Sequence, residues 1–307
     1  MAAKRWFESM YSAINMKYLH RKLWLCLLII IFAFSGCDSK KKDEFVSNTS
    51  EPNISLTVTD EWGKSAIDYN YIPCKQIKLG VIDTGTNFTE GILSISVCDQ
   101  NNLTQDLVGH GTFIAAHLRS LLPDATIFSI NVADENGEIT VETLVEGIDR
   151  AIDLGCNIIN ISLGIEYDNI SLRNKIERAI DMGIIIVSAA GNGYHDVLDY
   201  PAQYDGVISV IGRNPDNIDD ISNNQSLEKK SFSAPNFVVF NDSYVFSGSS
   251  VATTFVSALV AYLIQNNPTA TKEKIISVLE SSSIFPTDYS YGMINFERAL
   301  LELQSRI

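Results

Sequence analysis

The chain has 307 residues, 46% of them hydrophobic, which suits one large domain with a sizeable core and excludes a disordered or fibrous protein. The formal net charge of -14 argues against nucleic acid as a partner. The N-terminal 36 residues are instead basic. Their only acidic residue is Glu8, and their basic residues are Lys4, Arg5, Lys17, Arg21 and Lys22.

Residues 1–36 have the organisation of a secretory signal. A basic region is followed by an apolar run from Leu23 to Phe34, and small residues precede Cys37. The run is shorter than the roughly 20 residues that a bilayer span needs, so we expect removal of the signal rather than a membrane span. The letters FSGC resemble the bacterial lipobox, with Phe where a smaller aliphatic residue is usual. This resemblance implies lipid on Cys37 and an exported lipoprotein anchored to a membrane of the bacterial cell envelope.

The next stretch, residues 37–74, is predicted to be a polar tether followed by an N-terminal segment that wraps the domain, and residues 75–307 are predicted to form the domain itself. In an exported protein, Cys74 and Cys98 could form a disulfide, and free thiols are the alternative. Cys156 precedes an apolar run and is expected to be buried. The sequence has no CxxC pair and no His-rich cluster, so it predicts neither a metal site nor a cofactor.

Short β-rich runs alternate with helical patterns after residue 75. The runs are QIKLGVID, ATIFSINV, NIINISLG, GIIIVSAA and GVISVIG, and several are apolar on both faces, as buried parallel strands require. Helical patterns lie near residues 110–122, 140–154 and 169–182. The alternation predicts an α/β fold, with a mainly parallel sheet covered by helices on both faces. A later helix, SVATTFVSALVAYLIQNN, is apolar nearly all round and is predicted to be buried, and two further helices are expected near 271–281 and 293–304.

Asp83 ends the first run, in the sequence GVIDTG. An Asp-Thr-Gly after an apolar run is the signature of pepsin-like aspartic proteases, but a subtilisin-like serine protease could present the Asp of its triad in the same way. An aspartic protease would be all-β and would need a second such motif, or a short chain that dimerises. The chain alternates strand and helix and has no second motif, which favours the serine protease.

Three further polar residues lie where a serine protease needs them. GHGTFIAA places His110 at the start of an apolar helix, where the following glycine lets the backbone pack closely. FSGSSVATTF places Ser250 in the first turn of the buried helix, where unpaired N–H groups can face an oxyanion. VSAAGN puts Asn192 just past a buried strand, and its amide can supply a second oxyanion donor.

These motifs together resemble those of the subtilisin-like serine proteases, the subtilases. VIDTG, GHGT, NISLG, AAGN, YPA and GSSVA occur in the family's order between residue 76 and about residue 267. The resemblance implies a subtilisin-like three-layer α/β fold and a monomeric serine endopeptidase whose partner is a polypeptide substrate. Single residues of this set could instead be helix caps or turn residues, but that interpretation does not explain all six motifs in order.

The resemblance also implies roles for individual residues. Ser250 would attack the scissile carbonyl, His110 would transfer the proton, and Asp83 would stabilise the imidazolium. Asn192 and the Ser250 N–H would bind the oxyanion. The substrate strand would lie between Ser162-Leu163-Gly164 and an edge segment near residues 137–139.

Several residues depart from the family pattern or add to it. Asp199 precedes YPA, at a position that the resemblance places on the floor of the pocket for the residue before the scissile bond. A carboxylate there predicts a preference for a basic side chain, and a solvated loop carboxylate is the alternative. Ser249 replaces the usual Thr and Thr254 replaces the usual Pro, which keeps open a catalytically inactive binding module. The remaining histidines, His20, His117 and His195, are expected at the surface or in the signal.

Overall fold

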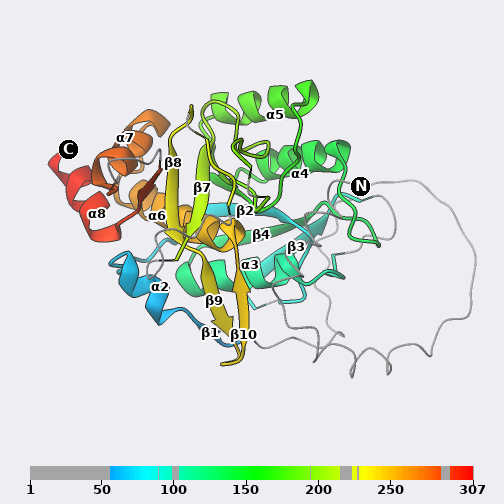
Figure 1. Cartoon of the computed structure of the whole chain (residues 1–307), viewed down its shortest axis with the longest axis horizontal. Coiled ribbons are helices and arrows are strands. Elements are labelled where there is room, and N and C mark those ends of the chain that lie inside the picture. The colour runs from blue at the N-terminus through cyan, green and yellow to red at the C-terminus, as the bar shows by residue number, and fades with distance from the viewer. Residues whose placement is uncertain are drawn as a thin grey trace, which may run out of the picture.

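The central feature of the fold is an eight-stranded sheet in the order β11-β8-β7-β6-β5-β2-β4-β3. Every strand pairing in it is parallel (Figure 1). This architecture is seen in a computed structural model that describes residues 56–88, 90–98, 104–193, 195–214, 223–226, 228–284 and 291–306. The predicted α/β fold with a mainly parallel sheet is therefore confirmed. The expected signal and Cys37 lie outside the described residues.

The strands of the large sheet are β2 (Lys78–Asp83), β3 (Ile92–Ser96), β4 (Thr126–Asn131), β5 (Ile158–Ile161), β6 (Ile185–Ala189), β7 (Ile208–Arg213), β8 (Ser231–Pro235) and β11 (Tyr291–Met293). A small antiparallel sheet contains β1 (Val58–Thr59), β9 (Phe237–Phe240) and β10 (Tyr244–Ser247). The helices are α2 (Glu61–Ala66), α3 (His110–Leu121), α4 (Val141–Asp153), α5 (Ile170–Asp181), α6 (Ser249–Asn266), α7 (Lys272–Ser282) and α8 (Phe296–Ser305).

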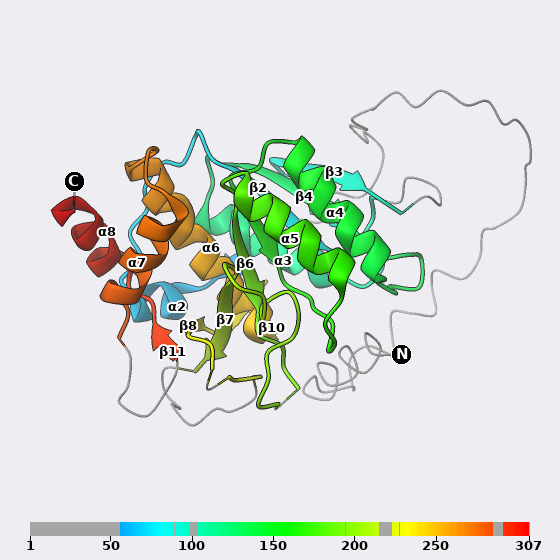
Figure 2. The ribbon, with the colours of Figure 1, turned by 90° about the horizontal axis from the view of Figure 1, so that it is seen from above.

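Helices cover both faces of the large sheet. In β6, Ile185 and Val187 pack in the core that contains α3 and α6, whereas Ile186 packs in the core of α4 and α5. Figure 2 shows α4 and α5 side by side on one face. Because neighbouring residues of a strand point to opposite faces, a strand between two helical layers must be apolar throughout. Every residue of β5, β6 and β7 is accordingly buried.

The helix α6 is buried around its whole circumference over most of its length. All its residues from Ser249 to Leu263 are buried, as its uniformly apolar sequence predicts. It lies against β5, β6, β7 and β8 on one side and against α3 on another. Among the described residues, no helix is both long enough and apolar enough to cross a membrane.

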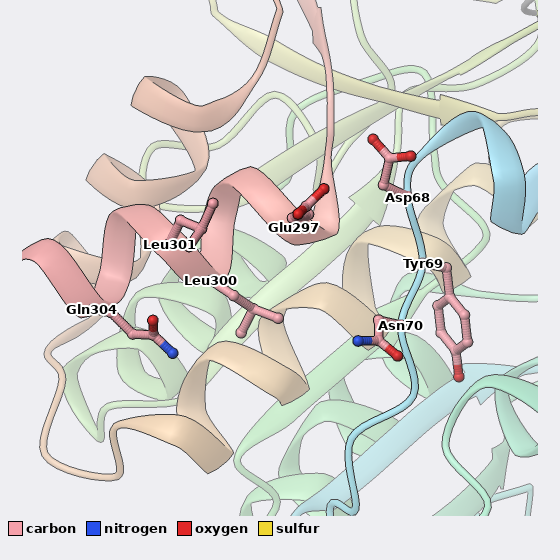
Figure 3. Close-up of a pocket in the computed structure, with 7 residues that line it drawn as sticks. All are labelled: Asp68, Tyr69, Asn70, Glu297, Leu300, Leu301 and Gln304. Atoms are coloured by element: carbon pink, nitrogen blue, oxygen red, sulfur yellow. The ribbon is translucent and has the colours of Figure 1, made fainter.

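Residues 56–69, here called the N-terminal segment, contain β1 and α2 and bind to several parts of the domain. β1 pairs with β9, and the ring of Trp62 stacks on Phe237 with 4.1 Å between ring centroids. The carbonyl of Ile67 accepts a hydrogen bond from the Phe296 backbone N–H at 2.8 Å. The segment also borders a pocket of about 360 Å³ against α8 (Figure 3).

The structure does not contain the disulfide considered for Cys74 and Cys98. The Cys74 thiol is buried and donates a 3.4 Å hydrogen bond to the carbonyl of Ile72. Cys156 is also buried, as predicted. Burial raises the pKa of both buried thiols to about 12, so they remain protonated near neutral pH and are poor nucleophiles.

Candidate active site

Asp83 and His110 meet where β2 ends and α3 begins. Asp83 is the last residue of β2, and His110 is the first residue of α3. The His110 Nδ1 atom lies 2.7 Å from Asp83 Oδ1, and the two residues are 3% and 0% exposed. Asp83 Oδ1 also accepts a hydrogen bond from the Thr84 backbone N–H at 2.8 Å. This bond fixes the carboxylate, which in turn orients the imidazole.

Close packing at Gly111 explains how α3 approaches the end of β2. A Cβ atom on Gly111 would lie 2.2 Å from the Gly85 carbonyl oxygen and 3.1 Å from Asp83 Oδ1. Any side chain would therefore push His110 away from Asp83. The expectation that the glycine after His110 permits close packing is confirmed.

Sequence reasoning missed Asp106, a buried carboxylate that holds the start of α3. Its oxygens accept hydrogen bonds from the backbone N–H groups of Val108, Gly109 and Thr112 at 3.0, 2.7 and 2.7 Å. The Thr84 hydroxyl donates to it at 2.9 Å. The available signal was an Asp shortly before a helix start, where carboxylates commonly accept bonds from the first N–H groups.

The two carboxylates determine the basicity of His110. Burial alone would lower the pKa of the imidazole, but the charge and hydrogen bond of Asp83, with a further contribution from the charge of Asp106, raise the pKa above its ordinary value. A raised pKa makes the ring a stronger proton acceptor, which suits a general base.

Ser250 lies in the first turn of α6, where Gly248 provides the turn into the helix with φ of 133°. It is 1% exposed, and its Oγ donates a 3.1 Å hydrogen bond to the Ser162 carbonyl. The preceding strand β10 contains Phe246, whose ring meets the edge of the His110 ring at 5.3 Å between centroids. The segment that leads into the Ser250 helix therefore borders the imidazole.

Asn192 is fixed by the residue that precedes Ser250. Its Oδ1 accepts hydrogen bonds from the Ser249 backbone N–H at 3.0 Å and from the Ser249 hydroxyl at 3.1 Å. These bonds occupy the oxygen of the side-chain amide and leave its NH₂ group as the donor end. Ser249 therefore retains a hydroxyl that contacts Asn192, although the family usually has Thr there.

Asp199 is buried against two backbone segments of the predicted site. It is 6% exposed, so the alternative of a solvated loop carboxylate is wrong. Cβ atoms on Gly191 and Gly164 would lie 2.3 Å from its Oδ2 and 2.9 Å from its Cβ, respectively. Asp199 Oδ1 accepts a 2.9 Å hydrogen bond from Asn224, another residue that sequence reasoning missed.

The environment of Asp199 disfavours its charge. Burial, with a smaller contribution from the negative charge of Glu166, raises the pKa of Asp199 to about 7, against the opposing effect of the hydrogen bond from Asn224. A carboxyl group with this pKa changes charge near neutral pH, and a neighbouring cation would favour the ionised form.

The two segments predicted to bind the substrate strand lie after β5 and close to the residues before α3. Ser162 and Leu163 are buried directly after β5, and Gly164 follows them. Gly137 lies close to Val108, two residues before His110, since a Cβ on it would be 2.6 Å from Val108 Cγ2. The pocket of Figure 3 contains none of the candidate catalytic residues.

The surface location expected for His117 is wrong. This residue is 1% exposed, and its Nε2 and Nδ1 atoms contact Asp60 Oδ2 and Thr254 Oγ1. Its partners are distant in the sequence, so local context could not identify them.

Comparison with known proteins places this geometry in a family. The model of the Subtilase family matches residues 74–298, which is well over half of the chain. The chain belongs to the subtilase family. It is accordingly a serine-type endopeptidase that acts on polypeptides.

Two relatives and one solved structure show how similar this subtilase is to known proteins. Subtilisin DY of Bacillus licheniformis is 29% identical over 250 residues, covering 73% of this chain and 90% of the relative. A thermostable alkaline protease of Halalkalibacterium halodurans is 28% identical over 289 residues, covering 84% and 79%. A solved mutant of the protease domain of PatA has the same fold, with a TM-score of 0.66, 21% identity and coverage of 76% of this chain and 97% of that domain.

Proposed function

We propose that this endopeptidase hydrolyses peptide bonds through Asp83, His110 and Ser250. The observation that carries the proposal is the buried 2.7 Å contact between His110 Nδ1 and Asp83 Oδ1. With Nδ1–H bound to the carboxylate, Nε2 is the ring nitrogen that accepts a proton. An inactive binding module would have no need for an imidazole whose pKa is raised by two buried carboxylates.

The reaction proceeds in two steps. Ser250 Oγ bonds to the scissile carbonyl carbon while its proton moves to His110 Nε2, and the charge of Asp83 stabilises the imidazolium. The imidazolium then donates the proton to the leaving amine as the C–N bond breaks, which gives an acyl-enzyme. Water, deprotonated by His110, hydrolyses the ester and restores Ser250. The direct test is labelling by a serine-directed fluorophosphonate, which wild type should show and Ser250→Ala should not.

The oxyanion formed in each step is proposed to bind the Asn192 amide and the Ser250 backbone N–H. The bonds from Ser249 to Asn192 Oδ1 support this role, because they hold the opposite end of the amide in place. A donor fixed before the reaction loses little energy to reorganisation when the negative charge develops. The substrate strand is proposed to lie between Ser162-Leu163-Gly164 and residues 137–139.

Asp199 is proposed to select a basic side chain before the scissile bond. Its burial against Gly164 and Gly191 supports this role, because the predicted substrate-binding segment and the Asn192 segment both border it. A guanidinium or ammonium group that enters would pair with the carboxylate in a partly dry site. The charge of Glu166, which helps to raise the Asp199 pKa, would attract the same cation.

The preference for a basic side chain before the scissile bond is expected to depend on pH. We expect the ratio of kcat/KM for matched Arg and Leu peptides to increase as the pH rises through about 7, because Asp199 becomes charged. The ratio cancels the titration of His110, which both substrates share. Asp199→Asn should lower the ratio at pH 8 by about 10- to 100-fold, the usual scale for a hydrogen bond to a charged group.

Glu166→Gln is the matched variant for this prediction. It removes a charge that raises the Asp199 pKa, so the midpoint of the ratio should move to lower pH. Equal wild-type rates on the Arg and Leu peptides at pH 8 would rule out selection by Asp199.

The location of the enzyme is proposed to be a membrane of the bacterial cell envelope, through lipid on Cys37. The signal-like residues 1–36 and the lipobox-like FSGC support this proposal. Wild type should fractionate with membranes and incorporate labelled palmitate. Cys37→Ala should lose the label and leave the membrane fraction, and unchanged fractionation together with retained label would contradict lipid on Cys37.

A further inference from the structure

His117 is a buried titratable residue that the proposed reaction does not use. It lies on α3 seven residues, or about two helical turns, after His110. Its Nε2 is 3.2 Å from Asp60 Oδ2, and its Nδ1 is 2.8 Å from Thr254 Oγ1. Asp60 belongs to the N-terminal segment and Thr254 to α6. One imidazole therefore connects the N-terminal segment, α3 and the helix that carries Ser250.

The Thr254 hydroxyl has two acceptors for its single proton. Thr254 Oγ1 lies 2.5 Å from the Val251 carbonyl oxygen as well as 2.8 Å from His117 Nδ1. An ionised Asp60 only accepts, so His117 Nε2 carries a proton and the neutral ring offers Nδ1 as an acceptor. The hydroxyl proton is then shared between Nδ1 and the Val251 carbonyl, to which the hydroxyl donates at 2.5 Å. If both ring nitrogens carry protons, the hydroxyl donates to the Val251 carbonyl alone, one residue after Ser250.

The charges around His117 come from the N-terminal segment. Asp60 faces Nε2, and Lys64 forms a 2.8 Å ion pair with the other oxygen of Asp60. From α6, the ring of Phe255 meets the imidazole edge-on, with 4.7 Å between centroids. Burial holds the pKa of His117 below its ordinary value despite the opposing effect of Asp60, which favours the neutral ring at neutral pH.

Thr254 is connected to Ser250 through the helix. In an α-helix, the N–H of residue i+4 bonds to the carbonyl of residue i, and Thr254 is four residues after Ser250. The Ser250 carbonyl also accepts a 3.3 Å hydrogen bond from the Ser162 hydroxyl. A proline, the usual residue of the family at this position, has neither the N–H nor a side chain that can bind His117.

We propose that Asp60, His117 and Thr254 are positioning residues for Ser250. The hydrogen bonds between them fix the first two turns of α6. Through Asp60, the N-terminal segment therefore helps to position Ser250. This inference rests on the proposed role of Ser250.

The test compares Thr254→Val with Thr254→Ser. The valine keeps the shape but removes the hydroxyl, and the serine keeps the hydroxyl. We expect Thr254→Val to lower kcat per fluorophosphonate-labelled site about tenfold, or about 1.4 kcal/mol, with KM within about twofold of wild type. Thr254→Ser should recover most of the loss. Counting labelled sites removes the effect of misfolded protein, so a purely structural role would leave this kcat unchanged.

Tyr262→Phe is the matched control. The Tyr262 hydroxyl lies 2.7 Å from the Tyr69 hydroxyl and donates to the Leu121 carbonyl at 2.8 Å, so it connects α6 with α3 and with Tyr69 in the N-terminal segment. It lies twelve residues after Ser250, or about 18 Å along the helix. We expect Tyr262→Phe to lower the Tm while kcat per labelled site stays within about twofold of wild type.

Asp60→Asn provides a second test if Thr254→Val does not fold. It should also lower kcat per labelled site. Wild-type kcat per labelled site in whichever of these two variants folds would overturn the proposal. An equal loss of kcat in Tyr262→Phe would overturn it too, because the effect would then be one of general helix packing. Both failures differ from failure of the proposed function, which would appear as labelling or cleavage by Ser250→Ala.

Discussion

Replacing Ser250 with alanine is expected to lower kcat by about 10⁶ while the protein stays folded. This scale is the one measured for removal of the nucleophile in subtilisin, a member of the same family, and does not come from the present structure. The physical reason is that alanine has no oxygen to form the acyl-enzyme and no proton for His110 to accept. The measurement is single-turnover cleavage of a peptide, together with fluorophosphonate labelling.

Folding of this variant is expected to change little. The substitution removes one hydrogen bond, from Ser250 Oγ to the Ser162 carbonyl, whose net contribution to stability is about 1 kcal/mol. Ser257→Ala is the matched control, because Ser257 is a buried serine of the same helix whose hydroxyl binds Asn160 at 2.9 Å. It should label like wild type. Cleavage by Ser250→Ala within a factor of about 100 of wild type would exclude Ser250 as the nucleophile.

Replacing Asn192 with alanine is expected to lower kcat by about 10²–10³ and to leave KM nearly unchanged. This range is also known from subtilisin, where the corresponding type of donor was removed. The loss falls on kcat because the amide binds the charge that develops in the transition state and binds the ground-state carbonyl only weakly. Steady-state kinetics on one peptide, with active sites counted by labelling, provides both constants.

Ser249→Ala refines the prediction for Asn192. It removes the 3.1 Å hydroxyl contact to Asn192 Oδ1 but keeps the 3.0 Å backbone contact. A donor held by one bond instead of two should still act, so kcat should fall by much less than in Asn192→Ala. If Asn192→Ala kept kcat within about threefold of wild type, the amide would not be an oxyanion donor.

The sequence predicted the elements that are periodic or uniformly apolar. The runs around β2, β4, β5, β6 and β7 and the six described helices after residue 109 appear within a few residues of their expected limits. The short elements were missed. α2 has only six residues and contains Gly63, and β8 to β10 lie in a stretch interrupted by Pro235, Asn236 and Asn241. Such segments are stabilised by tertiary packing, which a local pattern does not contain.

The same limit applies within the candidate site. Motifs located Asp83, His110 and Ser250 because each stands beside glycines at the end of a strand or the start of a helix. His117 contacts partners that only the fold brings together, because it is 57 residues from Asp60 and 137 residues from Thr254. A single sequence shows the two ends of such a contact but not that they meet.

The burial of α6 bears on when the enzyme can first cut a peptide. The helix packs against β5 to β8 and α3, and it also contacts α7 and α8 near the end of the chain. An apolar helix of this kind is stable only inside a finished core, since it would otherwise expose a surface that water disfavours on every side. A fragment that stops soon after Ser250 would lack the part of that core formed by α7 and α8. Ser250 can therefore be held in place only once these later helices have folded against α6.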